Sequence, residues 1–300
     1  MGLGMSLNLQ KHLQANGWSP LRYSNRTLPK GQPLQDAGAI PEDNFEKVVQ
    51  NSDIIFTMIS EDDILIELLD QALSAGESLK GKIFVDTSTV HLDTSELAAR
   101  RLSEHGATFI AAPVFGASPV AAAGKLIFAV AGPADAVETI RPLIINVMGR
   151  SIIEMGEEVR KSSLLKLSGN ILVISFMEAI AEAQVLAELT SLGTHQLEEF
   201  IGNMFGPVLE SYSKRITTGA YAPSLDTTPG FTAALACKDM RHALSIADGH
   251  GTRLPTVELA LGRLNSAREV AGEWLDSAGV YGTARVEGGL AFWSGNSRQG

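Results

Sequence analysis

The sequence predicts an α/β domain with a mainly parallel sheet, followed by an all-α domain, with one long helix between the two. Up to about residue 155, short apolar segments alternate with amphipathic ones, which is typical of βαβ units. From about residue 158 onward, apolar residues recur at helical spacing over long segments. We therefore expect an α/β domain over residues 1–157, a helical domain over residues 158–278 and a glycine-rich, loosely ordered tail over residues 279–300.

Each expected element follows from its own pattern. Residues 53–59 and 82–86 form nearly continuous apolar segments, which favours strands buried on both faces. The other expected strands cover residues 21–24, 107–111, 126–131 and 151–154. Helices are expected between the strands over residues 7–16, 62–75, 94–105 and 134–147, and in the second half over residues 159–190, 195–204, 207–218, 231–249 and 256–275.

Composition excludes several classes of function. The formal net charge of −10 disfavours a surface for nucleic acid or for an anionic membrane. The lone cysteine, Cys237, excludes an intramolecular disulfide, and the six histidines lack the spacing of metal ligands. No continuous apolar run reaches the roughly 18 residues of a membrane span, and the N-terminal residues do not form a signal peptide. We expect a soluble cytoplasmic protein without a metal.

Polar residues follow the expected strand over residues 21–24. A dinucleotide site that takes NAD places an acidic residue at this position, for the ribose hydroxyls. Here Asn25 and Arg26 stand in its place, followed by Thr27. An arginine at this position can pair with the 2′-phosphate of NADP. The alternative is a surface turn with a solvated arginine.

Hydroxyl groups and a glycine turn follow three further strands. Ile59 and Ser60 end one strand, and Ser88 and Thr89 follow another. Ligands of parallel sheets bind at the carboxyl ends of the strands, although hydroxyls there more often cap helices. The turn at residues 112–117 is small and contains Gly116, which permits a close approach of the backbone.

Lys166 and Asn170 lie four residues apart in the expected helix over residues 159–190. Their side chains therefore share one helix face, one turn apart, and both can donate hydrogen bonds to one oxygen. Such a pair suits an oxygen on which negative charge develops. Taken alone, the two residues are as well explained by a solvated helix face.

The helical half offers weaker signals. Phe231 precedes Lys238 and Asp239, which taken alone are a surface pair, while Cys237 is expected to be a small buried residue. At the other end of the chain, Gly2-Leu3-Gly4 is a partial match to the glycine fingerprint of dinucleotide-binding domains, but no strand precedes it and position 7 is leucine.

Taken together and in order, these segments resemble the β-hydroxyacid dehydrogenase family, which includes 3-hydroxyisobutyrate dehydrogenase, glyoxylate/succinic semialdehyde reductases and 6-phosphogluconate dehydrogenase. The resemblance covers residue 1 to about residue 275 and implies a Rossmann-like domain with an all-α C-terminal domain. The segments that carry it are Met1-Gly2-Leu3-Gly4-Met5-Ser6-Leu7-Asn8-Leu9, Asn25-Arg26-Thr27, Asp86-Thr87-Ser88-Thr89-Val90, Ala112-Pro113-Val114-Phe115-Gly116, Lys166-Leu167-Ser168-Gly169-Asn170, and Phe231 with Lys238-Asp239.

The resemblance also implies roles. Lys166 would be the general acid and base, and Asn170 would orient the substrate or Lys166. Substrate contacts would come from Ser88, Phe115, Gly116 and Phe231. The cofactor, NADP rather than NAD, would be bound by Gly2, Asn25, Arg26, Thr27, Ile59, Ser60, Thr89 and Lys238.

Three departures from the family pattern are visible. Residue 1 aligns inside the glycine fingerprint, so we expect the first strand and first glycines to be missing from this chain through truncation. Phe115 stands where a serine often binds the substrate carboxylate, which suggests a larger or less polar substrate. Ala117 replaces a second glycine and narrows access to the backbone.

The leading hypothesis is an NADP-dependent oxidoreductase that transfers hydride between NADPH and a carbonyl or hydroxy-acid substrate, as a homodimer or higher homo-oligomer. One alternative is imine reduction, against which Lys166 argues. Another is a non-catalytic protein that keeps the fold as a binding or oligomerisation module.

Overall fold

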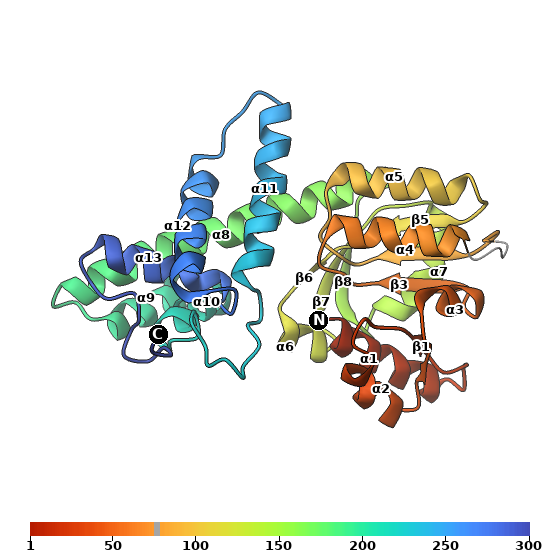
Figure 1. Ribbon diagram of the computed structural model, residues 1–300, viewed down its shortest axis with the longest axis horizontal. Helices are drawn as coiled ribbons and strands as arrows, with labels where there is room; N and C mark the ends of the chain where they lie inside the picture. The colour runs from red at the N-terminus through yellow and green to blue at the C-terminus, as the bar shows by residue number, and fades with distance from the viewer. Residues whose placement is uncertain (75–78) are drawn as a thin grey trace. The chain divides into compact units, whose positions relative to one another are not determined.

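The computed structural model describes residues 1–74 and 79–300, which divide into two compact units, Met1–Lys166 and Leu167–Gly300 (Figure 1). The division falls inside helix α8 (Val159–Leu189), a few residues beyond the boundary expected at residue 157. The helix is therefore shared: its first turns belong to the α/β unit and the remainder to the helical unit.

The first unit contains short strands in three groups. β3 (Ile54–Thr57), β4 (Ile83–Asp86) and β5 (Thr108–Ala111) pair in parallel, in that order. β1 (Arg22–Tyr23) pairs in parallel with β2 (Ile40–Pro41). β7 (Leu126–Val130) lies between antiparallel β6 (Val114–Phe115) and parallel β8 (Gly149–Glu154). Among the described residues no strand joins β1 to β3, so the single sheet expected from the sequence is divided at this point.

Helices connect these strands as the βαβ pattern predicts. Those between the expected strands are α1 (Gly2–Ala15), α4 (Asp62–Ser74), α5 (Leu92–Ser103) and α7 (Ala134–Ile144). The helix expected over residues 62–75 ends at Ser74, and its last expected residue lies outside the described part. The sequence missed β2, β6, the 3-10 helix Leu28–Gly31, and the short helices α2 (Gln32–Asp36), α3 (Phe45–Gln50) and α6 (Ser118–Ala122), because two to six residues carry too little periodicity to be recognised.

Both faces of the central strands are buried, which explains their continuous apolar sequences. Phe84 and Phe109 pack with α4 and α5 in one cluster, whereas their neighbours Val85 and Ile110 pack with α1 and α7 in another. Alternate residues of a strand point to opposite faces, so helices on both sides require apolar residues at every position. Figure 1 shows α4 and α5 running alongside these strands.

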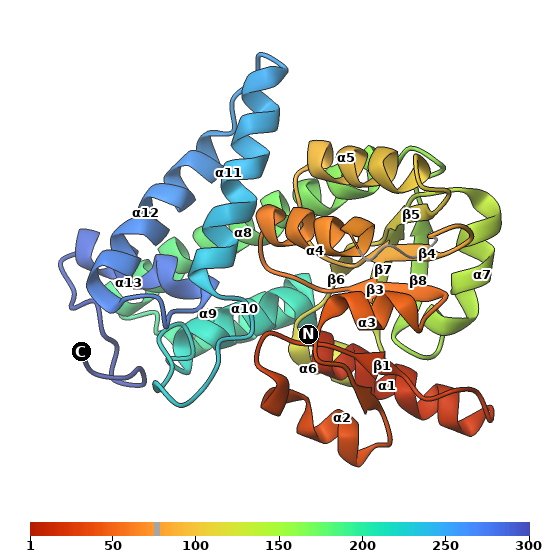
Figure 2. The same ribbon diagram turned by 45° about the vertical axis from the view of Figure 1, so that its right-hand side comes forward.

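The second unit is all helical, as predicted. Its elements are the greater part of α8, then α9 (Thr194–Phe205), α10 (Pro207–Thr217), α11 (Ala233–Gly249), α12 (Pro255–Ala271), the 3-10 turn Ser277–Gly279 and α13 (Val280–Glu287). α11 and α12 lie side by side (Figures 1 and 2). Ile174, Met177 and Ala181 of α8 pack with residues of α9 to α13 in one core.

The expectation of a loosely ordered tail after residue 278 is wrong. Residues 280–287 form α13, and Phe292 is only 6% exposed. Tyr221 holds the following segment, because its hydroxyl donates to the Phe292 carbonyl at 2.8 Å and accepts from the Ser294 amide at 2.7 Å. Arg285 also forms an ion pair with Glu188 of α8. The glycine content suggested disorder, but the hydrogen bonds of Tyr221 and the Arg285–Glu188 ion pair hold this segment in place.

Helix α8 is, by length and composition, apolar enough to cross a membrane, although the search for continuous apolar runs predicted no such segment. Isolated polar residues interrupt the continuous apolar runs of α8, but they lower the mean hydropathy of the helix only slightly. Ile174, Met177, Ile180, Ala181 and Val185 of this helix are buried in the helical core. A core helix of a globular protein passes the same test of length and apolar content.

Candidate active site

The carboxyl ends of β3 and β4 are joined by a buried carboxylate. Thr57 and Asp86 are partners in the strand register, and Asp86 is 2% exposed. Its Oδ1 accepts hydrogen bonds from the Thr57 hydroxyl at 2.8 Å and from the Ser88 hydroxyl at 2.7 Å. Burial of a charge requires such partners, so Asp86 fixes the turns that leave both strands. Sequence patterns assign Asp86 no role of its own, although its place at the end of an apolar strand is a usable signal.

Ser88 is occupied by this network. Its hydroxyl donates to Asp86 and accepts from the Ile59 amide at 2.8 Å. A serine hydroxyl has one proton to donate, and in this arrangement that proton goes to Asp86. Ile59 is held through its amide, Thr89 is half-buried beyond Ser88, and Ser60 is exposed on the neighbouring turn.

The N-terminus of α1 lies at the same edge. A Cβ built on Gly2 would lie 3.6 Å from the Met58 side chain, just beyond the end of β3. A Cβ on Gly4 would lie 2.9 Å from the backbone nitrogen of Ala122, so only glycine allows this approach of α1 to α6. The first turn of α1 has no acidic residue. A helix N-terminus without a nearby carboxylate favours an anion.

Asn25, Arg26 and Thr27 follow β1 and are all exposed. The Asn25 side-chain amide donates to the Thr27 carbonyl at 2.9 Å and shapes the turn. Throughout residues 1–74 and 79–300, no carboxylate lies within ion-pair distance of the Arg26 guanidinium. This cation can therefore meet an anionic ligand without first breaking an internal pair.

Lys166 is placed by the buried start of α8. The Ser162 hydroxyl donates to the Ala129 carbonyl of β7, and the Ser163 hydroxyl is bonded to the Ser95 hydroxyl of α5 at 2.8 Å. Arg160 adds ion pairs to Asp93 at 2.6 Å and Glu96 at 2.5 Å on α5. Because Lys166 is one turn beyond Ser162, these bonds fix the point from which its side chain extends.

The Lys166 ammonium lies over the Phe115 ring, with 4.6 Å between Nζ and the ring centroid. This distance is within the range of cation–π attraction. Phe115 ends β6, and the next residue, Gly116, has φ +126°, a conformation that favours glycine. The structure thus brings together two of the residues that the resemblance singled out, Phe115 and Lys166.

Within the helical unit, Asn170 lies against Lys238 and Asp239. The Asn170 side-chain amide donates to Asp239 Oδ2 at 2.6 Å, and Lys238 Nζ lies 3.3 Å from Asp239 Oδ1. Lys238 and Asp239 are 6% and 4% exposed, so the surface-pair interpretation is wrong. Asp239 was missing from the expected site, although a carboxylate inside the apolar stretch Ala-Cys-Lys-Asp-Met was a usable signal.

Phe231 and Cys237 both pack in or against the core of the helical unit. Phe231 is half-buried against the core, and its carbonyl accepts from the Ser277 amide at 2.8 Å. Cys237 is fully buried, as expected, and burial raises the pKa of its thiol, which disfavours a nucleophilic role.

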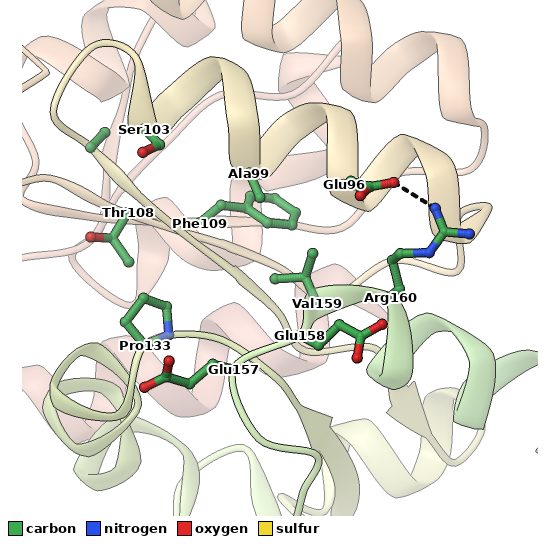
Figure 3. A pocket seen from close by; sticks show the side chains of 11 residues that line it. Glu96, Ala99, Ser103, Thr108, Phe109, Pro133, Glu157, Glu158, Val159 and Arg160 are labelled. Atoms are coloured by element: carbon green, nitrogen blue, oxygen red, sulfur yellow. Dashed lines mark hydrogen bonds and ion pairs between the residues drawn. The ribbon is translucent and has the colours of Figure 1, made fainter.

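A pocket of about 410 Å³ lies elsewhere in the first unit, beside the start of α8 (Figure 3). None of the expected site residues lines it. Glu96, Glu157 and Glu158 contribute carboxylates, while Arg160 is already paired with Glu96. An excess of negative charge disfavours the phosphates of a nucleotide, so we do not assign the cofactor to this pocket.

Two family models cover most of the chain. Residues 1–156 match the NAD binding domain of 6-phosphogluconate dehydrogenase, and residues 161–283 match the NAD-binding domain of NADP-dependent 3-hydroxyisobutyrate dehydrogenase. The chain belongs to the β-hydroxyacid dehydrogenase family. The resemblance found in the sequence is thereby confirmed, and with it the class of an NAD(P)-dependent dehydrogenase that acts on CH–OH groups.

Curated relatives of this β-hydroxyacid dehydrogenase family member align along nearly their whole length. It is 31% identical to the NADH-dependent oxidoreductase ucdB of Aspergillus ustus, over 97% of this chain and 98% of that protein. It is 28% identical to glyoxylate/succinic semialdehyde reductase 1 of Arabidopsis thaliana, over 93% of each chain.

Solved structures share the fold. Mycobacterium tuberculosis 3-hydroxyisobutyrate dehydrogenase matches with a TM-score of 0.77 at 24% identity, over 95% of this chain and 96% of that one. An imine reductase from Pseudomonas sp. matches with a TM-score of 0.60 at 17% identity, over 94% of this chain and 95% of that one. The predicted arrangement of a Rossmann-like domain and an all-α domain is therefore confirmed.

Substitution of Asp239 by Asn is expected to destabilise the helical unit by about 3 kcal/mol, because the buried Lys238 ammonium loses its carboxylate partner. The double variant K238M/D239N should recover part of this loss. Urea unfolding followed by the fluorescence of Trp274 and Trp293 measures both effects. Glu258→Gln, which removes an exposed ion pair with Arg253, is the matched control and should leave the unfolding midpoint unchanged. Equal midpoints for Asp239→Asn and the control would contradict the prediction.

Proposed function

We propose that this protein is an NADP-dependent reductase in which Lys166 is the general acid. The observation that carries the proposal is the placement of Lys166: its helix is anchored to β7 and α5, and its ammonium is held over the Phe115 ring. Asn170 follows one turn later on the same helix face. A rigidly placed cation beside an amide suits an oxygen that gains negative charge.

The first unit contains groups that suit a nicotinamide dinucleotide. The N-terminus of α1 beside Met58 would hold the pyrophosphate, and Gly2 leaves room for it. Arg26, with Asn25 and Thr27, would hold the phosphate on the adenosine ribose, while Ile59 and Ser60 follow β3 and Thr89 follows β4. The bound nicotinamide supplies the hydride.

Lys166 completes the reduction. As hydride adds to the carbonyl carbon, the C=O π electrons move onto oxygen, and the Lys166 ammonium donates its proton to that oxygen. The products are an alcohol and oxidised cofactor, and a proton from solvent restores the ammonium. Before proton transfer, the charge of Lys166 stabilises the developing alkoxide. In the reverse direction, neutral Lys166 would accept the proton of the hydroxyl group.

Asn170 and Lys238, which lie in the helical unit, would support this chemistry. Asp239 accepts from Asn170 and pairs with Lys238, so one buried carboxylate fixes both side chains. Asn170 would orient the substrate or Lys166, and Lys238 would bind the cofactor. Phe231 would supply an apolar contact for the substrate.

Lys166→Ala is expected to lower kcat at least a hundredfold, because proton donation and charge stabilisation are both lost, while NADPH affinity changes less than about threefold. Stopped-flow turnover and fluorescence titration with NADPH measure the two quantities. Lys161→Ala, an exposed lysine of the same helix, should leave both unchanged. Near-normal turnover of Lys166→Ala would refute the assignment, and reduction of imines alone by the wild type would favour the imine-reductase alternative.

Arg26→Ala is expected to lower the preference for NADPH over NADH about ten- to a hundredfold, since one charge-assisted contact to the 2′-phosphate disappears. The measurement is the ratio of kcat/KM values for the two cofactors. Arg150→Ala, another exposed arginine of this unit, is the control. A wild-type preference for NADH, as the name of the Aspergillus relative states for that protein, would contradict the NADP assignment.

The helical unit also exposes an apolar surface that we assign to a second copy of the chain. Leu172, Leu186 and Leu189 of α8 are 58%, 64% and 53% exposed. Phe200 and Phe205 of α9 are each 54% exposed and contact each other edge to face at 6.0 Å. These five residues are large, apolar and exposed on two consecutive helices, and a symmetric dimer would remove them from water.

Leu186→Glu is therefore expected to shift the protein from dimer to monomer at micromolar concentration, because a buried carboxylate would have no partner in the interface. Sedimentation velocity measures the change. Val286→Glu, at an equally exposed apolar position of α13, is the control and should remain dimeric. A wild-type protein that sediments as a monomer would remove the basis of this assignment.

A further inference from the structure

One side of the Lys166 ammonium is covered by carbon. Its Nζ lies 4.6 Å from the centre of the Phe115 ring, and a phenyl ring offers no donor or acceptor of its own. A carbonyl oxygen that accepts a proton from Lys166 must come within hydrogen-bond distance of Nζ, about 2.9 Å. Where the oxygen approaches along the ring, the groups attached to the carbonyl carbon lie beside it.

The ring itself is held in place by the strand that carries it. Phe115 pairs with Ile127 across the antiparallel β6–β7 ladder. The following residue, Gly116, has φ +126°, and a Cβ there would lie 2.8 Å from the Leu126 side chain and 2.9 Å from that of Val120. The backbone on both sides of Phe115 is therefore constrained, so the ring forms a fixed wall next to the ammonium.

The hydroxyls of Ser88 and Thr57 do not compensate for this wall. The Ser88 hydroxyl, the expected donor to a substrate oxygen, gives its proton to the buried Asp86 carboxylate at 2.7 Å. The Thr57 hydroxyl donates to the same carboxylate at 2.8 Å. A second carboxylate brought to this edge would meet a like charge and no hydroxyl donor from either residue.

We propose that Phe115 determines the substrate class: the enzyme reduces aldehydes or ketones that carry an apolar group beside the carbonyl, in preference to those that carry a carboxylate there. The inference rests on the proposed function, in which Lys166 donates the proton. An apolar group gains by leaving water for the ring face. A carboxylate in the same place loses hydration, faces the negative side of the ring and competes with the carbonyl for the ammonium.

Two pairs of aldehydes of equal size test the proposal. Glyoxylate is compared with 2-methylpropanal, in which an isopropyl group replaces the carboxylate beside the carbonyl. Succinic semialdehyde is compared with 4-methylpentanal, in which the same replacement lies two carbons further from the carbonyl. For the wild type with NADPH, kcat/KM is expected to favour the apolar member of each pair at least about tenfold. The Phe115→Ser variant should lower that ratio at least about tenfold, chiefly by lowering KM for the anionic member. Phe115→Leu, which keeps an apolar wall, should retain the preference.

The possible results distinguish a failure of the Phe115 assignment from a failure of the proposed function. Wild-type preference for the carboxylate members, or an unchanged ratio in Phe115→Ser, overturns the role of Phe115 while reduction by Lys166 stands. Failure of the wild type to reduce any of the four aldehydes although it binds NADPH overturns the proposed function and this inference with it. NADPH affinity and circular dichroism show whether Phe115→Ser is folded. If it is not, the kcat/KM ratio of the wild type still decides the substrate class.

Discussion

The anchoring of the first turns of helix α8 is the constraint on which the placement of Lys166 depends. Its first turns are bound to the α/β unit through the buried Ser162 and Ser163 hydroxyls and through Arg160. Its later turns carry Ile174 and Met177 into the helical core. Because an α-helix has a fixed rise and rotation per residue, anchoring its start fixes where Lys166 and every later residue leave the axis. Loss of those anchors would displace Lys166, the proposed proton donor, without any change in the neighbouring Phe115.

Buried carboxylates organise the polar residues in each unit. Asp86 takes the hydroxyl protons of Thr57 and Ser88, and Asp239 holds Asn170 and Lys238. A buried charge is stable only when hydrogen-bonded, so each carboxylate imposes an orientation on its neighbours. The consequence differs between the two: Asp86 takes the hydroxyl proton of Ser88, whereas Asp239 sets the direction of Asn170 and Lys238.

Family membership and fold leave the substrate open. The chain shares its fold with proteins named as 3-hydroxyisobutyrate dehydrogenase and as imine reductase, at 24% and 17% identity. Function on a shared fold is decided by the residues that meet the substrate. In this protein the Phe115 ring lies against Lys166 and departs from the family pattern, so we propose that it acts on specificity, while the proposed proton donor is retained.

The sequence by itself determined the fold class, the family and most of the helices, because periodicity over ten or more residues and the order of short motifs are local properties of the chain. It also singled out Lys166, Asn170, Phe115 and Lys238 as candidates. Only the tertiary structure showed that Lys238 and Asp239 are buried, that the Ser88 hydroxyl is bonded to Asp86, and that the segment after residue 287 is pinned by Tyr221. Each of these depends on partners distant in sequence or on burial. A local pattern specifies neither, because packing between elements decides which side chains lose contact with water.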